Sequence, residues 1–442
     1  MNRKMLAVLI AALVGWGTAS HTSMASAANA PQYFVVNLPS LGGINSEGNS
    51  INEFGLISGF SDTAGTTGDL HTLATAWVFG QKINLKTLGG ANSSVVWPVK
   101  NGFSVISGIS QTDKTDPNHE SWSCSAFFYG TDTGAGSTCL GFVWAFGKMT
   151  SLSPLPGGNN SFATGTNNRL QTVGWAENGV HDSSCNIHHD SDQVLQFLPV
   201  VWGPEPHHIQ TLPLLRGDSS GAATAINDRG QIVGISGLCD QAVGRETARH
   251  MVLWQNGHAT DLGNIGGNAW NTPMAINQQG DIVGFANTAP GDGFSLHAFY
   301  RSHAGGSPID LGVLYPGDSV SQALGINDRG QVVGLSCGAN GCNGFLWQNG
   351  VMLDLNKVVP GYDGVIEDAQ DINDLGQITG QAADTAGNLV SFWATPMAGH
   401  GSHGSAASGA PPKTALSPKA KQELMQRLGL GRIDLATGSI RH

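Results

Sequence analysis

The stretch 225–234, AINDRGQIVG, decides the fold, because the same pattern returns twice at intervals of fifty residues. These copies read AINQQGDIVG at 275–284 and GINDRGQVVG at 325–334. Two further copies and two degenerate ones lie elsewhere in the chain, at 50–59, 371–380, 98–108 and 165–174. Self-similarity at such a period is typical of proteins built from stacked structural repeats.

Each repeat predicts four short strands. The Asn-Asp-x-Gly segment predicts a tight turn between the first two, because Asn and Asp tolerate left-handed conformations and Gly adopts positive φ without strain. A loop and an aromatic strand follow, as in HMVLW at 250–254, and Asn-Gly at 256–257 predicts the turn into the fourth strand. That strand ends in a pattern such as DLGNIGG at 261–267. The strand segments are short and rich in β-branched or aromatic residues.

Seven copies can be counted, and a four-stranded sheet buries both of its faces only if copies stack radially, as in a propeller. The last copy ends at 392–394 without a fourth strand, whereas the chain opens with a strand of that type at 33–43. We expect these fragments to complete one blade, which closes the ring and removes an exposed sheet edge. We therefore predict an all-β, seven-bladed β-propeller of four-stranded blades over 31–398. An open solenoid and a two-sheet sandwich are the alternatives.

The repeat resembles that of a known family in three elements. These are the tripeptide His297-Ala298-Phe299 and the patterns Ile-Asn-Asp-x-Gly-Gln-Val-Val-Gly and Leu-Gly-x-Leu-Gly-Gly. Together they resemble the extracellular HAF-repeat family, over about residues 40–395. The resemblance implies a secreted bacterial propeller-like protein of unassigned activity. It supplies no catalytic residues for this chain.

The first residues predict an export signal. Arg3 and Lys4 precede the apolar stretch 6–14, and Ala25-Ser26-Ala27 offers a cleavage site of small residues. The apolar stretch is too short to span a bilayer. We take 1–27 as a signal peptide and expect a secreted or periplasmic protein.

The segment 399–442 is predicted to be a flexible tail. Its first part is rich in Gly, Ser, Ala and Pro, which is typical of a linker. Ser417-Pro418 can begin a short helix, with Ala420, Leu424 and Leu428 on one side and Gly429 as its stop. Such a helix can dock on the propeller or on a partner.

The composition limits the partners. Charged residues make up 12% of the chain and there are 62 glycines, which fits a turn-rich extracellular β-protein. The formal net charge of −11 disfavours nucleic acid as a partner. No second long apolar run follows the signal, so we expect no membrane span in the mature protein, which we take to be a monomer.

The strand order predicts that both tight turns of a repeat lie at one end of the propeller, and that the long loops share the opposite end. Loop variation on a rigid scaffold is where binding usually resides. All six cysteines fall in equivalent long loops, and an exported protein can oxidise them. We predict the disulfides Cys124–Cys139, Cys185–Cys239 and Cys337–Cys342.

The long loops also carry the ligand-binding candidates. Polar and aromatic side chains there that could line a site are His119, Glu120, Trp122, His188, His189, Asp190, Asp192 and Trp270. The His and Asp residues lack the spacing of a zinc site, so we predict neither a metal nor a cofactor. Recurring tryptophans of the third strand are predicted to pack between blades.

No motif identifies a reaction. Gly217–Gly221 matches the Gly-x-Ser-x-Gly nucleophile pattern, but it falls between two repeats rather than on a strand-to-helix elbow. We therefore expect a non-enzymatic binding or scaffold protein that engages a glycan or an extracellular protein through the long-loop face. The alternative is a secreted polysaccharide hydrolase or lyase with its site at the central funnel, since propellers host both.

Overall fold

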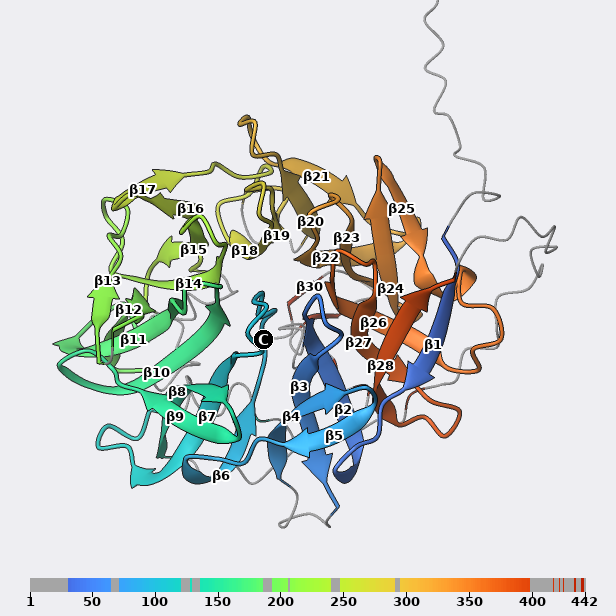
Figure 1. Ribbon diagram of the computed structural model, residues 1–442. Coiled ribbons are helices and arrows are strands. Elements are labelled where there is room, and N and C mark those ends of the chain that lie inside the picture. The colour runs from blue at the N-terminus through green and yellow to red at the C-terminus, as the bar shows by residue number, and fades with distance from the viewer. Residues whose placement is uncertain are drawn as a thin grey trace, which may run out of the picture. The chain divides into compact units, whose positions relative to one another are not determined.

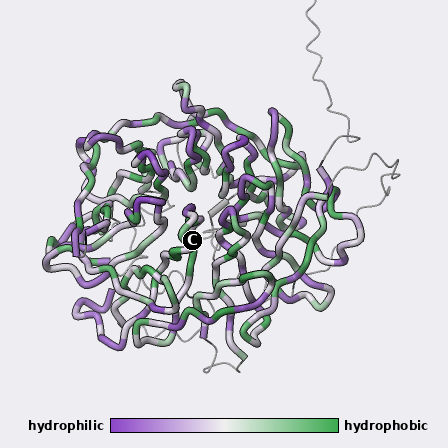
Figure 2. The backbone as a smooth tube through the Cα atoms, viewed as in Figure 1, coloured by the Kyte–Doolittle hydropathy of each residue, from purple (hydrophilic) through white to green (hydrophobic). Residues whose placement is uncertain are grey.

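The computed structural model describes residues 31–64, 71–120, 128, 136–185, 193–205, 207–239, 247–290 and 295–397, with 416, 421, 424, 433–434 and 439–440 from the C-terminal segment. The described chain is all-β, and its antiparallel units of about four strands follow one another along the chain (Figure 1). Hydrophobic stretches run within the sheets, and many connecting segments are hydrophilic (Figure 2). The predicted signal peptide, 1–27, lies outside the described residues.

Three sheets consist of four antiparallel strands each. Their strands are β6 (Gly89–Ser94), β7 (Ile106–Thr115), β8 (Ser137–Ala145) and β9 (Lys148–Leu152); β10 (Gly157–Thr166), β11 (Thr172–His181), β12 (Leu195–Trp202) and β13 (Ile209–Thr211); and β14 (Ser220–Ile226), β15 (Ile232–Gly237), β16 (His250–Gln255) and β17 (His258–Asp261). The strands are therefore short, as the repeat predicted.

Two eight-stranded sheets each contain two antiparallel units joined by a single parallel bridge. One holds β1 (Tyr33–Asn37), β2 (Gly42–Ile51), β3 (Ile57–Thr63), β4 (Thr72–Val78), β5 (Gln81–Asn84), β26 (Val365–Ile372), β27 (Ile378–Ala383) and β28 (Leu389–Pro396). The other holds β18 (Thr272–Ile276), β19 (Ile282–Asn287), β20 (Leu296–Arg301), β21 (Ile309–Gly312), β22 (Asp318–Ile326), β23 (Val332–Gly338), β24 (Gly341–Gln348) and β25 (Val351–Asp354). A 3-10 turn, η2 (Leu355–Lys357), follows β25, and β29 (Ile433–Asp434) pairs with β30 (Ser439–Ile440).

The predicted pairing of the first strand with the last repeat is present. Strand β1 runs antiparallel to β28 in a register that joins Tyr33 to Pro396 and Asn37 to Phe392. The Met397 N–H donates to the Gln32 carbonyl, which extends this pairing beyond the strands. No sheet of the described chain closes on itself. Instead each unit contacts its neighbour: β4 contacts β6, β8 contacts β10, β12 contacts β14, β16 contacts β18, β20 contacts β22, β24 contacts β26, and β28 contacts β2.

The repeated glycine of the second strand has a steric cause. A Cβ added to Gly234 would lie 2.0 Å from the Ala222 carbonyl oxygen of the paired strand, and one on Gly334 would lie 1.9 Å from the Gln322 oxygen. Side-chain carbons are not found at such distances. The paired backbones can approach this closely only where no side chain intervenes.

The core lies between neighbouring units. In one cluster, Val233 and Met251 of one repeat pack against Ile282 and Phe299 of the next. The third-strand tryptophan Trp254 packs with Val173 and Val201 of the preceding repeat, as predicted, and its Nε1 donates to the Pro213 carbonyl at 2.7 Å. Each sheet thus buries both faces against its neighbours, which a single four-stranded sheet could not do.

The tripeptide His297-Ala298-Phe299 is structural in this fold. Ala298 and Phe299 are fully buried. His297 Nδ1 lies 2.9 Å from a carboxylate oxygen of Asp310 on the adjacent strand β21, and this contact helps lower the pKa of Asp310 against the opposing effect of burial. The histidine therefore ties the third strand to the fourth.

Candidate functional site

The predicted candidates of the long loops divide into three groups. His119 is exposed, at a residue with a positive φ of 57°. Glu120 and Trp270 are buried, with Trp270 only 4% exposed. The remaining candidates, Trp122, His188, His189, Asp190 and Asp192, lie outside the described residues.

Glu120 holds two parts of the chain together. Its Oε1 accepts hydrogen bonds from the Val194 N–H at 2.8 Å, the Leu195 N–H at 2.5 Å and the Gln193 side chain at 3.2 Å. A carboxylate with several fixed donors fastens the loop after β7 to the start of β12. We assign it a structural role.

Glu120 belongs to a buried group of three carboxylates, with Asp116 and Glu177. One oxygen from each lies within 4.8 Å of the others, and all three side chains are buried. Oxygen donors of this kind suit hard cations. However, Asn160 Nδ2 already donates to Asp116 at 2.6 Å and to Glu177 at 3.0 Å, and Gln193 donates to both glutamates. The amides satisfy these oxygens, so the group is a hydrogen-bonded network and we assign no metal to it.

Burial raises the pKa of Glu177 to about 7, and the nearby charge of Glu120 adds to the shift. Burial also raises the pKa of Glu120, against the hydrogen bonds that it accepts. Only Glu120 of this group was predicted from the sequence. Asp116 and Glu177 come from different repeats, and no local spacing connects them.

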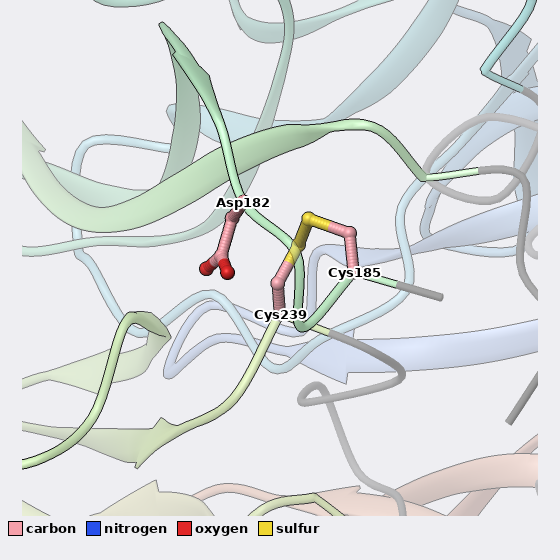
Figure 3. Close-up of side chains that lie close together, drawn as sticks. All are labelled: Asp182, Cys185 and Cys239. Carbon is pink, nitrogen blue, oxygen red and sulfur yellow. A yellow bond between two sulfur atoms is a disulfide. The ribbon is translucent and has the colours of Figure 1, made fainter. Parts of the chain in front are cut away.

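Two of the predicted disulfides are confirmed. Cys185 is bonded to Cys239 across 54 residues, beside Asp182 (Figure 3), and Cys337 is bonded to Cys342. Cys139 is also disulfide-bonded, and its predicted partner Cys124 lies outside the described residues. The Cys185–Cys239 bond links the long loops of two adjacent repeats.

At the opposite end of the strands, the turn asparagines link repeat to repeat. Asn227 Nδ2 donates to the Asn277 carbonyl at 3.1 Å, and Asn277 Nδ2 donates to the Asn327 carbonyl at the same distance. The same step occurs from Asn52 to Asn101, Asn101 to Thr166, Asn167 to Asn227, Asn327 to Asn373, and Asn373 to Asn52. Each Oδ1 also accepts N–H groups of its own turn, as in Asn227 with Arg229 and Gln231.

The residue after each asparagine forms a second set of contacts. Asp328 accepts the Gln278 N–H at 2.8 Å, Asp374 accepts the Asp328 N–H at 2.7 Å, and Glu53 accepts the Asp374 N–H at 3.0 Å. Gly102 occupies this position in the second repeat and has no side chain to accept from Glu53. Backbone donors of neighbouring turns therefore fix these carboxylates, and Gly102 leaves its position in the set without a side chain.

A pocket of about 210 Å³ lies at this tight-turn end. It is lined by Asn52, Glu53, Lys100, Asn101, Gly102, Asn168, Asp228, Ile276, Asn277, Gln278, Ile326, Asn327, Asp328 and Asp374. Lys100 is the cation among these lining residues, and its Nζ lies 2.5 Å from buried Asp371. Burial, followed by the charge of Asp374, raises the pKa of Asp328, because like charges disfavour ionisation. The pocket is thus polar and rich in carboxylates.

Exposed apolar side chains stand at the same turns. Phe54 is 70% exposed, Phe103 63% and Leu375 60%. The Phe54 ring lies against Gly102, since a Cβ there would be 3.6 Å from Cε2 of the ring. The corresponding turn positions of the other repeats carry Arg169, Arg229, Gln279 and Arg329. The sequence shows this contrast between apolar and polar residues at one turn position, but the turn pattern alone predicts only backbone conformation.

Comparison with known proteins shows an all-β fold with β-propeller neighbours. The β-propeller domain of the Trilobed protease from Pyrococcus furiosus covers 82% of this chain and 95% of its own, with 10% identity and a TM-score of 0.45. Polysaccharide lyase Uly1 covers 82% and 92%, with 8% identity and a TM-score of 0.43. The acylaminoacyl peptidase of Pyrococcus horikoshii has 12% identity and a TM-score of 0.45 over 79% of this chain, which spans 50% of that protein.

No protein-family model matches the chain, and no curated protein matches its sequence. The structural neighbours differ in activity, so they indicate no single reaction. Within the described residues, no helix is long and apolar enough to cross a membrane.

Proposed function

We propose that this chain is an exported, non-enzymatic glycan-binding protein whose site is the tight-turn end of a closed seven-bladed β-propeller. The resemblance to the extracellular HAF-repeat family and the disulfide bonds support export. The proposal moves the binding surface from the long loops, where the sequence had placed it, to the opposite end of the strands.

Closure with seven blades is supported by contacts between the last and first repeats. Asn373 donates to the Asn52 carbonyl at 3.0 Å, so the seven steps between turn asparagines return to their start. Lys100 of the second repeat pairs with Asp371 of the last one. The β1–β28 pairing supplies the strand that the last repeat lacks. A closed ring also leaves few exposed strand edges.

The observation that carries the glycan proposal is a polar pocket whose lining residues Glu53 and Gly102 are each followed in the chain by an exposed phenylalanine, Phe54 and Phe103. A sugar ring has an apolar C–H face, which packs on an aromatic ring, and hydroxyl groups that need fixed hydrogen-bond partners. Phe54 and Phe103 supply the rings, and Asp328 and Asp374 supply acceptors. Because backbone N–H groups already orient these carboxylates, little conformational entropy is lost on binding.

The charge of the pocket narrows the class of glycan. Glu53, Asp228, Asp328 and Asp374 contribute carboxylates, whereas the charge of Lys100 is offset by Asp371. Repulsion between like charges disfavours sugars that carry carboxylates. We therefore infer a preference for neutral sugars or amino sugars over uronic acids.

A secreted polysaccharide hydrolase or lyase is the second candidate, because β-propellers host enzymes as well as binding proteins. The two functions differ in outcome, because a hydrolase releases products from the glycan that it binds. Release of products from the bound glycan would favour the enzyme.

Titration calorimetry with the glycan that gives the strongest signal on an array tests the binding proposal. Phe54→Ala and Phe103→Ala are each expected to weaken binding about tenfold, or about 1.4 kcal/mol. Phe146→Ala is the matched control, because Phe146 is a fully exposed phenylalanine in the β8–β9 turn outside the pocket. Wild-type affinity in both pocket variants, or the absence of any glycan ligand, would contradict the proposal.

A further inference from the structure

A large apolar cluster occupies the long-loop end of the inner strands, opposite the glycan site. We call it the central apolar cluster. It joins side chains of many repeats: Trp97, Ile109, Phe128, Cys139, Phe162, Trp175, Cys185, Phe197, Ala222, Cys239, Trp270, Met274, Phe285, Leu296, Val320, Leu324, Leu335, Cys337, Cys342, Leu389 and Leu424. Its members include the cysteines of both confirmed disulfides, which places it beside the long loops.

One member of this cluster is not part of any repeat. Leu424 lies 28 residues after Pro396, the last residue of β28, yet it is only 3% exposed. Leu416, from the same C-terminal segment, is partly buried and also packs against the cluster. Two leucines from outside the repeats therefore contact an apolar surface that the repeats create.

The local structure around Leu424 supports a one-sided contact. Lys421 and Leu424 are both helical, at the place where the sequence predicts a short helix. Residues three apart lie near each other on a helix, but Lys421 is exposed whereas Leu424 is buried. Lys421 therefore stays in solvent, whereas Leu424 contacts the cluster.

We propose that the C-terminal segment bearing Leu416 and Leu424 is a built-in, displaceable ligand of the central apolar cluster. The repeats pair their strands without it, because β28 takes its fourth strand from β1. The segment can therefore leave without breaking a sheet. Its release uncovers apolar surface, so any partner that uses this part of the long-loop face competes with the chain's own tail.

The chemistry of the surface defines what it accepts. The aromatic side chains Trp97, Phe162 and Trp175 pack together, with Phe162 and Trp175 stacked at 4.1 Å between ring centroids. An apolar cluster of this kind suits leucine side chains rather than a polar ligand. This inference is independent of the glycan site, which lies at the other end of the strands.

The full-length variant Leu424→Asp tests the proposal, with Lys421→Asp as the matched control. Aspartate at 424 places a charge in an apolar contact, whereas aspartate at 421 stays in solvent. In hydrogen exchange, we expect amides around 416–424 to exchange at least tenfold faster in Leu424→Asp than in wild type. We also expect increased fluorescence of a dye that binds apolar surface, with Lys421→Asp resembling wild type in both measurements.

The exchange of the strand amides separates a displaceable ligand from an ordinary part of the core. The proposal requires that protection in β10, β14 and β22 stay unchanged in Leu424→Asp. The milder variant Leu424→Ala must also loosen the segment while leaving the strands intact. Loss of strand protection in both variants would overturn the proposal. So would a wild-type segment that exchanges at the unprotected rate.

Discussion

Replacing Lys100 by methionine removes the ion pair through which the second repeat reaches the last one. Lys100 Nζ lies 2.5 Å from Asp371 Oδ1 and donates to the Ile372 carbonyl at 2.8 Å. Asp371 is fully buried, whereas the Lys100 side chain is 20% exposed. The variant therefore leaves a buried carboxylate without its counter-charge, while methionine keeps most of the apolar stem.

The magnitude follows from the partners that remain. Removing one member of a buried ion pair costs about 3–5 kcal/mol. The Asp371 carboxylate still accepts the Ile51 N–H at 2.9 Å and the Ile372 N–H at 2.8 Å, which places the loss near the lower limit. We expect Lys100→Met to lower the free energy of unfolding by about 3 kcal/mol. For a domain of this size, that lowers Tm by about 4 °C.

Urea unfolding, followed by tryptophan fluorescence and circular dichroism, measures this loss. The double variant Lys100→Met with Asp371→Asn is expected to recover most of it, because the amide is uncharged and keeps an oxygen for the Ile51 N–H. Lys148→Met serves as the control, since Lys148 is exposed and its change should stay within about 0.5 kcal/mol. A single variant within 1 kcal/mol of wild type, or a double variant no more stable than the single one, would refute the reasoning.

Two further predictions concern the buried carboxylate and the strand glycine. Burial raises the pKa of Glu177 to about 7 from its ordinary 4.5, so between these pH values the folded chain holds a proton that the unfolded chain releases. The contribution of Glu177 to the free energy of unfolding is therefore present in full below pH 4.5 and is lost as the pH rises through 7. Glu177→Gln should flatten this dependence by about 3 kcal/mol between pH 4.5 and 8 in urea titrations, while exposed Glu205→Gln leaves it unchanged. Gly234→Ala should lower the free energy of unfolding by about 3 kcal/mol, because the added Cβ meets the Ala222 oxygen. Gly230→Ala should lower it by about 1 kcal/mol, because Gly230 has open space around it but a φ of 74°. Equal losses of stability in thermal unfolding would contradict the steric argument.

The proposed binding surface lies at a different end of the strands from the one that the long loops predicted. The long loops vary most and carry His119, Glu120 and Trp270, so the sequence favoured that end. In the structure Glu120 and Trp270 are buried, and the polar pocket lies at the tight turns that recur in every repeat. The sequence explains the turn residues by their backbone conformation, whereas Phe54 and Phe103 become candidates only because Glu53 and Gly102 beside them line the pocket.

The repeat pattern by itself determined the strands, the tight turns, the pairing of the first strand with the last repeat, and the disulfides Cys185–Cys239 and Cys337–Cys342. These features follow from turn chemistry, strand periodicity and equivalent places in a repeat. Only the tertiary structure decided that the turn asparagines donate to neighbouring repeats, that Asp116 and Glu177 join Glu120, and that Leu424 enters the central apolar cluster. Burial and charge at those positions depend on atoms from segments far apart in the chain, which no local pattern records.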